Sequence, residues 1–117
     1  PNLCHDMHDC EVAAGDSWLS RIVPEILHSS AWRNGGMLVI VSDEGTDNDS
    51  PGGRALAIIA TPTVKAGTQI HQSFDHYGLL ATIEDLWHLP RLQNSAQAHS
   101  IASALTGASQ RTSMVLE

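Results

Sequence analysis

The sequence has no long apolar run and few basic residues. No uncharged apolar stretch approaches the roughly 20 residues that a membrane-spanning helix needs, and nothing at the amino end resembles a signal peptide. Because 13 acidic residues stand against 6 basic ones, the net charge is −7, which argues against a nucleic acid or an anionic membrane surface as the main partner. We therefore expect no transmembrane segment and no nucleic-acid partner.

Cysteine is also scarce, because only Cys4 and Cys10 are present. Two cysteines are too few for a disulfide scaffold, but they can close one small loop. That pairing would favour an oxidising compartment, so we expect a secreted or periplasmic protein. With His5 and His8 they also form a cluster of zinc-type ligands, but the short spacing favours a disulfide or two free thiols. The chain begins at Pro1 without a methionine, so the missing signal peptide says little about export.

The first third of the chain predicts a loop followed by helix. Residues 1–15 are rich in ligand-type side chains and show neither helical nor alternating apolar spacing, which is typical of an irregular loop. From Asp16, a good N-cap, apolar residues recur on one helical face as far as Leu27. Pro24 predicts a kink, or two short helices of which it opens the second.

Residues 37–45 hold the strongest strand signal and the first candidate site. An uncharged apolar run rich in β-branched residues predicts a strand buried on both faces. Asp43 and Glu44 follow it, and Gly45 permits a sharp exit. In open α/β sheets ligands bind beyond the carboxyl ends of the strands. Two neighbouring carboxylates there repel each other, and a bound cation offsets that repulsion.

A second apolar run, residues 56–60, predicts another strand. A parallel neighbour of the first strand is favoured, while an antiparallel pairing or a missing intervening strand stays open. The acidic loop between them, with Asp47, Asn48 and Asp49, lacks the glycine and distal glutamate of an EF-hand and is interpreted as solvated. Two strands are too few for a stable open sheet, so we expect the missing strands upstream of Pro1.

The clearest helix follows a turn at residues 65–68. Asp75 or Ser73 caps it, His76 falls in its first turn, and it ends before Pro90. Its apolar face comprises Leu79, Leu80, Ile83, Leu86 and Trp87. Residues 101–105 predict one short helix. The remaining tryptophans, Trp18 and Trp32, are expected with Trp87 as core anchors, and the surface histidines are expected to be His28, His71, His88 and His99.

Four segments carry a family resemblance: PNLCHDMHDC, then GDSWL with VPEIL, then AWRNGGMLVIVSDEG, then HYGLLATIEDLWHLP. In this order the chain resembles, over residues 1–96, the carboxyl-terminal half of the bacterial phosphoesterase family, which includes acid phosphatases and phosphatidylcholine-type phospholipases C. That family lies within the alkaline-phosphatase-like superfamily. The resemblance implies an α/β/α sandwich, of which residues 1–117 would be one domain or the carboxyl-terminal part of a larger one.

The resemblance also implies roles for individual residues. Asp43 and Glu44 are similar to the strand-end ligands of a divalent metal ion whose identity the sequence does not give, and His8 to a catalytic side chain that contacts the substrate phosphate. His76 is similar in position to the late active-site histidine of the superfamily. The family's amino-terminal half supplies a Glu-Asn metal pair and a serine or threonine nucleophile, and nothing here matches either. Ser42 lies at the end of a buried strand, so we expect its hydroxyl to be hydrogen-bonded within the protein and not to act as the nucleophile.

These features predict metal-dependent hydrolysis of phosphoric esters, of the acid phosphatase or phospholipase C type, through a phosphorylated nucleophile supplied by an upstream half. The chain alone is expected to be inactive and to pair with that half or with another copy. One alternative is a non-catalytic fragment or truncated paralogue that acts as a metal-binding or interaction module. A third hypothesis is a small zinc-stabilised interaction module.

Overall fold

The computed structural model describes residues 1–45 and 52–106. The chain divides into two compact units, with the boundary between Ala60 and Thr61. The sequence predicts one domain over residues 1–117, and that assignment stays a prediction. The acidic loop with Asp47, Asn48 and Asp49 falls outside the described residues. None of the described helices is long and apolar enough to cross a bilayer.

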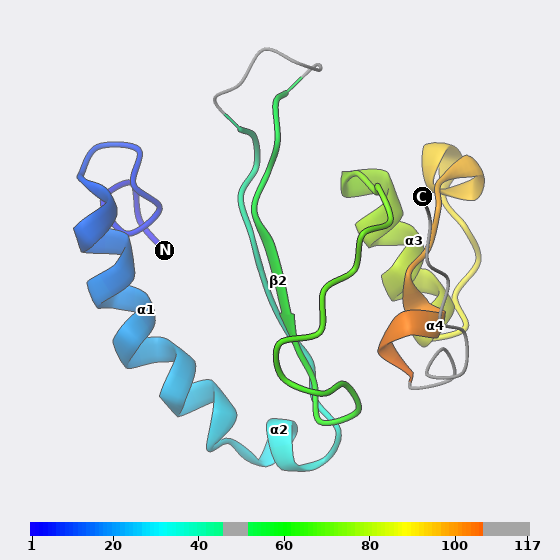
Figure 1. Ribbon diagram of the computed structural model, residues 1–117, viewed down its shortest axis with the longest axis horizontal. Helices are drawn as coiled ribbons and strands as arrows, with labels where there is room; N and C mark the ends of the chain where they lie inside the picture. Colours follow the sequence, from blue (N-terminus) through cyan, green and yellow to red (C-terminus); the bar gives the residue numbers. More distant parts are fainter. Residues whose placement is uncertain (46–51, 107–117) are drawn as a thin grey trace. The chain divides into compact units, whose positions relative to one another are not determined.

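The first unit begins with α1, Val12–Leu27, followed by the short helix α2, Ser30–Arg33 (Figure 1). The predicted start at Asp16 is wrong, because the helix already includes Val12 and its N-cap position is Glu11. Of the two alternatives predicted at Pro24, the division into two short helices is wrong, since α1 runs through this residue. Pro24 lies in the last turn, where its missing N–H removes a single hydrogen bond, and its carbonyl still accepts from the amide of His28 at 3.0 Å.

Two strands complete this unit, β1 (Leu38–Val41) and β2 (Ala57–Ala60). They pair antiparallel, with Leu38 opposite Ala60 and Val41 opposite Ala57. The parallel arrangement favoured from the sequence is therefore wrong, and the antiparallel alternative is correct. Parallel strands need a crossover connection, usually helical, whereas residues 42–56 contain no described helix and return the chain as a hairpin.

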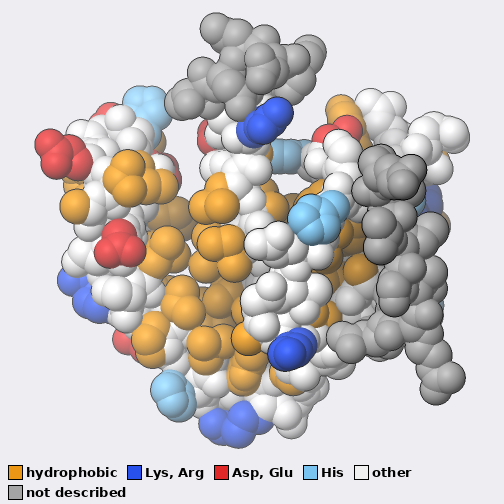
Figure 2. Space-filling model, viewed as in Figure 1, with side chains coloured by type: hydrophobic (Ala, Val, Ile, Leu, Met, Phe, Trp, Pro, Cys, Tyr) orange, Lys and Arg blue, Asp and Glu red, His pale blue; other side chains and the backbone are white. Residues whose placement is uncertain are grey.

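The hairpin is apolar but is not covered on both faces by the described residues. Figure 2 shows hydrophobic side chains exposed along it, and Ile58 in β2 is 50% exposed. Leu56 and Val41 are exposed as well. Large contiguous apolar surface of this kind marks an interaction site in a soluble protein. The predicted burial of the first strand on both faces is therefore wrong for the described residues, because β1 is half-buried over Leu38–Ile40 and exposed at Val41.

The second unit consists of α3 (His76–Leu86), the 3₁₀ helix η1 (Gln93–Gln97) and α4 (Ala102–Leu105), with η1 and α4 both packed on α3 (Figure 1). The Asp75 side chain accepts a hydrogen bond from the Gly78 amide at 2.8 Å, which confirms the predicted cap. The predicted turn around Gly67 and the short helix near the end are confirmed too.

The core of this second unit differs from the one that the apolar pattern of α3 predicts. Its buried hydrophobic residues are Ala81, Ile101 and Leu105. Trp87 is 65% exposed, so its predicted role as a core anchor is wrong, while Trp18 and Trp32 in the first unit are partly buried. The apolar face of α3 is only partly covered, whereas two polar residues of the same helix, Thr82 and Glu84, are buried. The predicted surface histidines are all exposed: His28, His71, His88 and His99.

Candidate functional site

The carboxylate pair lies directly after β1. Ser42 closes the strand: its amide donates to the carbonyl of Leu56 at 3.0 Å, and its hydroxyl accepts from the Leu56 amide at 2.9 Å. The serine hydroxyl is thus satisfied, as predicted. Asp43 and Glu44 follow it with both side chains exposed, and the Asp43 carboxylate accepts from the Glu44 amide at 2.9 Å. Two adjacent acidic side chains are therefore exposed directly after the end of β1.

Gly45 explains how the chain leaves this pair. Its amide donates to the carbonyl of Gly52 at 2.6 Å. A Cβ at this position would collide with the backbone of Arg54, which no flexible side chain could relieve by moving away. Only glycine can therefore occupy this position while the two backbone segments stay this close together. The close approach of the two backbones fixes the position at which Asp43 and Glu44 emerge.

The two carboxylates suit a hard divalent cation, because such ions prefer oxygen ligands. Two adjacent carboxylates are only part of a ligand set. Within residues 1–45 and 52–106, no group of three or more His, Cys, Asp or Glu side chains is placed to hold a metal ion.

His8 lies in a loop at the amino end that a disulfide closes. Cys4 and Cys10 are bonded to each other, with their Cα atoms 4.7 Å apart. Both thiols are consumed by this bond, which contradicts the zinc-stabilised alternative. The His8 imidazole is exposed, and its Nδ1 lies 2.7 Å from a carboxylate oxygen of Asp9. An exposed histidine paired with a carboxylate is equipped to hold and transfer a proton.

His76 is the first residue of α3 and is exposed. It follows the capping residue Asp75, so its backbone position is fixed by the helix start. His76 belongs to the second unit, whereas His8, Asp43 and Glu44 belong to the first. The structure therefore brings together Asp43 with Glu44, and Cys4 with Cys10. The roles of all the predicted site residues stay predictions.

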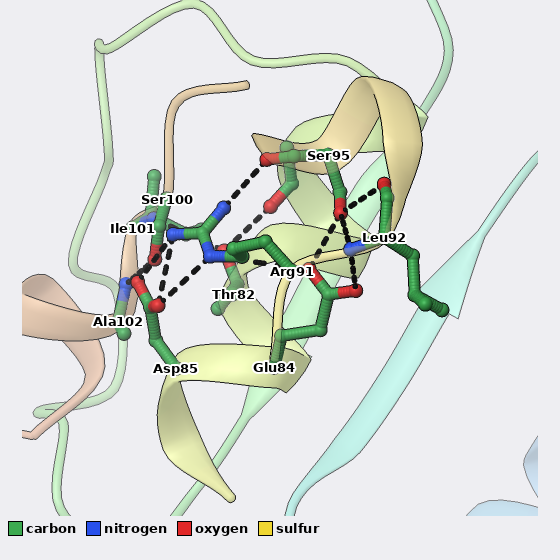
Figure 3. Close-up of polar contacts among 10 residues, drawn as sticks. Thr82, Glu84, Asp85, Arg91, Leu92, Ser95, Ser100, Ile101 and Ala102 are labelled. Carbon is green, nitrogen blue, oxygen red and sulfur yellow. Dashed lines mark hydrogen bonds and ion pairs between the residues drawn. The ribbon is translucent and has the colours of Figure 1, made fainter. Parts of the chain in front are cut away.

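A buried polar network in the second unit was missed by the sequence reasoning. Glu84 is only 2% exposed. Its carboxylate accepts from the Leu92 amide at 3.0 Å and from the Ser95 hydroxyl at 2.7 Å (Figure 3). Arg91 adds an ion pair with the same carboxylate at 3.9 Å and donates to the Ser95 carbonyl at 2.7 Å. The charge of Glu84 is thus compensated inside the unit, as a buried carboxylate requires.

The neighbouring Asp85 extends this network toward α4. The Nη2 atom of Arg91 donates to both oxygens of the Asp85 carboxylate, each at 2.8 Å (Figure 3). A hydrogen bond from Ser100, together with Arg91, lowers the pKa of the Asp85 carboxyl below its usual value. Thr82 completes the link, because its hydroxyl donates to the Gly78 carbonyl and accepts from the Ile101 amide at 3.0 Å. The sequence gives one signal of this network: Glu84 and Asp85 are consecutive acidic residues, and Arg91 follows them.

Several curated proteins are similar to this chain. A phosphatidylinositol-3-phosphatase of Mycobacterium tuberculosis is 32% identical over 106 residues, covering 86% of this chain and 32% of the relative. A phosphate-repressible acid phosphatase of Penicillium chrysogenum is 26% identical, covering 79% of this chain and 23% of the relative. An acid phosphatase of Aspergillus fumigatus is 28% identical, with 79% and 21% covered. The chain thus spans about a third or less of the length of these relatives.

No solved structure is significantly similar to this chain. The model of the Phosphoesterase family matches residues 1–90, which include the His8 loop, the carboxylate pair and the whole of α3. This match covers well over half of the chain and agrees with the four sequence motifs. The chain therefore belongs to the Phosphoesterase family.

Proposed function

We propose that this chain is the carboxyl-terminal part of a metal-dependent phosphatase of the Phosphoesterase family. The observation that carries the proposal is the exposed pair Asp43 and Glu44 at the end of β1, inside the region that the family model matches. The relatives described above are named as phosphatases, which favours a phosphate monoester over a phospholipid diester as the substrate.

In this proposal Asp43 and Glu44 supply two oxygen ligands to a divalent cation. A cation bound there would neutralise charge that develops on the phosphoryl oxygens. His8 donates a hydrogen bond to a phosphoryl oxygen or protonates the leaving group, and His76 contributes a second imidazole. The nucleophile and the remaining ligands come from an upstream half.

The same proposal explains the exposed apolar surface of the hairpin. An α/β/α sandwich covers both faces of its sheet with helices and extends its edges with further strands. The half-exposed Ile58, together with Leu56, Val41 and the open edges of two paired strands, would be covered in that arrangement. We propose that upstream strands and helices complete the sandwich, that the chain alone is inactive, and that the complete protein is secreted or periplasmic.

A second candidate is a non-catalytic fragment or truncated paralogue. It is favoured by one observation, the small share of each relative that the chain spans. The two candidates differ in whether residues of this chain take part in hydrolysis of a phosphate ester, as the first candidate requires of His8.

Replacement of His8 tests this difference. His8→Ala in the full-length protein is expected to lower kcat on a chromogenic phosphate ester by about 10²-fold or more, the usual scale for a lost acid-base group. The fold should be unaffected because the side chain is exposed. His71→Ala, which removes another exposed imidazole, is the matched control and should leave kcat unchanged. Turnover within a few-fold of the parent in His8→Ala would make His8 an ordinary loop residue.

A further inference from the structure

The pairing of His8 with Asp9 determines which ring nitrogen of His8 carries hydrogen. The distance of 2.7 Å joins His8 Nδ1 to Asp9 Oδ1. An ionised carboxylate only accepts hydrogen bonds, so Nδ1 must be the donor. Within the part of the chain that the structure describes, Nε2 of His8 has no hydrogen-bond partner. Nε2 is therefore the nitrogen that is available to a ligand.

This pair is exposed, so its own attraction is too weak to hold it. The side chains of His8 and Asp9 are 74% and 58% exposed, and exposed ion pairs contribute about 0–1 kcal/mol. The backbone of the loop must therefore supply the geometry. The Asp9 amide donates to the Leu3 carbonyl at 2.8 Å, and the His8 amide donates to the Asp6 carboxylate at 3.0 Å. The backbone amides of both residues are thus held by hydrogen bonds within residues 3–9.

Met7, which precedes the pair, adopts a left-handed backbone with φ of 72°. This conformation is rare and costly for a residue with a side chain, and it persists only where the surroundings impose it. Here the Cys4–Cys10 bond closes the loop around Met7. Strain of this kind next to a paired histidine indicates that the loop is built to hold one arrangement of His8 and Asp9.

Two contacts hold the loop on α1. Gly15 is the buried residue of that helix, and a Cβ there would lie 2.7 Å from Met7 Cγ and 3.0 Å from the His5 carbonyl. The loop therefore packs against the helix backbone as closely as glycine allows. On the next turn the His5 ring stacks on Trp18, with centroids 5.3 Å apart and planes inclined by 16°. The loop is thus anchored to a rigid element.

We infer that Asp9 is a positioning residue that holds His8 in the Nδ1–H tautomer and leaves Nε2 facing the substrate. The inference rests on the proposed function of His8. When His8 is protonated, the Nε2 proton passes to the leaving-group oxygen as the phosphorus–oxygen bond to that group breaks. The ring then returns to the neutral form with its remaining proton on Nδ1, still donated to Asp9.

The test combines a spectroscopic and a kinetic measurement on the full-length protein. Histidine ring ¹⁵N shifts at alkaline pH, assigned by comparison with His8→Ala, are expected to show Nδ1 protonated in the parent. Asp9→Ala should shift the proton of His8 toward Nε2, and Asp9→Asn should retain part of the parent tautomer because its amide oxygen still accepts. Asp9→Ala should lower kcat on a chromogenic ester by about 10- to 100-fold with little change in KM, the usual effect of losing a partner that orients a functional histidine.

Asp16→Asn is the matched control, since it removes an exposed carboxylate from α1 that has no described contact with His8. It should change neither the tautomer nor kcat. Ring shifts of His8 that are the same in the parent and in Asp9→Ala would overturn the inference whatever the activity. If instead the tautomer changes as expected while His8→Ala keeps full activity, the positioning by Asp9 holds and the proposed catalytic role of His8 fails.

Discussion

Asp43→Ala and Glu44→Ala, made separately in the full-length protein, are each expected to abolish metal binding and to lower turnover by about 10³-fold or more. The size of the effect follows from the several kcal/mol of charge stabilisation that a metal ion supplies to phosphoryl transfer, at about 1.4 kcal/mol for each factor of ten. Metal content by elemental analysis and hydrolysis of a chromogenic phosphate ester are the measurements.

The fold of both variants should stay intact, because each side chain is exposed and packs against little. Circular dichroism and the midpoint of thermal unfolding should therefore match the parent. Glu25→Ala removes an exposed carboxylate from α1 and is the matched control for loss of charge. Unchanged metal content in both Asp43→Ala and Glu44→Ala would contradict the proposed ligand role.

Glu84→Ala is expected to have the largest effect on stability. It removes the acceptor of two hydrogen bonds, from the Leu92 amide and the Ser95 hydroxyl, and the ion pair of Glu84 with Arg91, which keeps its pair with Asp85. Both donors keep a second partner, since the Leu92 amide also donates to the Ser95 hydroxyl and that hydroxyl also donates to the Leu92 carbonyl. A hydrogen bond to a charged group contributes about 1.5–3 kcal/mol, so we expect the free energy of unfolding to fall by about 3 kcal/mol for the two bonds that are lost. Chemical denaturation of the full-length protein measures this change.

Glu84→Gln separates hydrogen bonding from charge. The amide oxygen still accepts from the Leu92 amide, so the loss should be clearly smaller than in Glu84→Ala. Because Glu84 is buried, at 2% exposure, and is not one of the proposed metal ligands, metal content should not change in either variant. A free energy of unfolding within about 0.5 kcal/mol of the parent in Glu84→Ala would show that the network does not support the unit.

The sequence predicted those elements whose signals are local. The cap Asp75, the helix that follows it, the turn around Gly67 and the end of β1 before Asp43 depend on neighbouring residues and are all as expected. The helix start was misplaced because Val12, with no capping side chain before it, gives no start signal, whereas Asp16 does. The local pattern also predicted that the Ser42 hydroxyl is hydrogen-bonded.

Features that depend on distant residues could not be predicted in the same way. The direction of β2 is set by how residues 42–56 return the chain, and apolar runs alone do not distinguish parallel from antiparallel pairing. The burial of Glu84 depends on partners at Leu92 and Ser95, which lie beyond the end of α3. For the candidate site, the sequence predicts that two carboxylates, Asp43 and Glu44, follow a strand. The pairing of His8 with Asp9 could not be predicted, because it depends on the geometry of the closed loop.

The central claim is that this chain contributes Asp43, Glu44 and His8 to an active site that an upstream half completes. The most direct measurement is hydrolysis of a chromogenic phosphate ester by the chain alone, by the upstream half alone, and by the two after mixing or co-expression. The account predicts no hydrolysis by either part and metal-dependent hydrolysis by the mixture, abolished by Asp43→Ala. Hydrolysis by the upstream half alone at the rate of the mixture would contradict it.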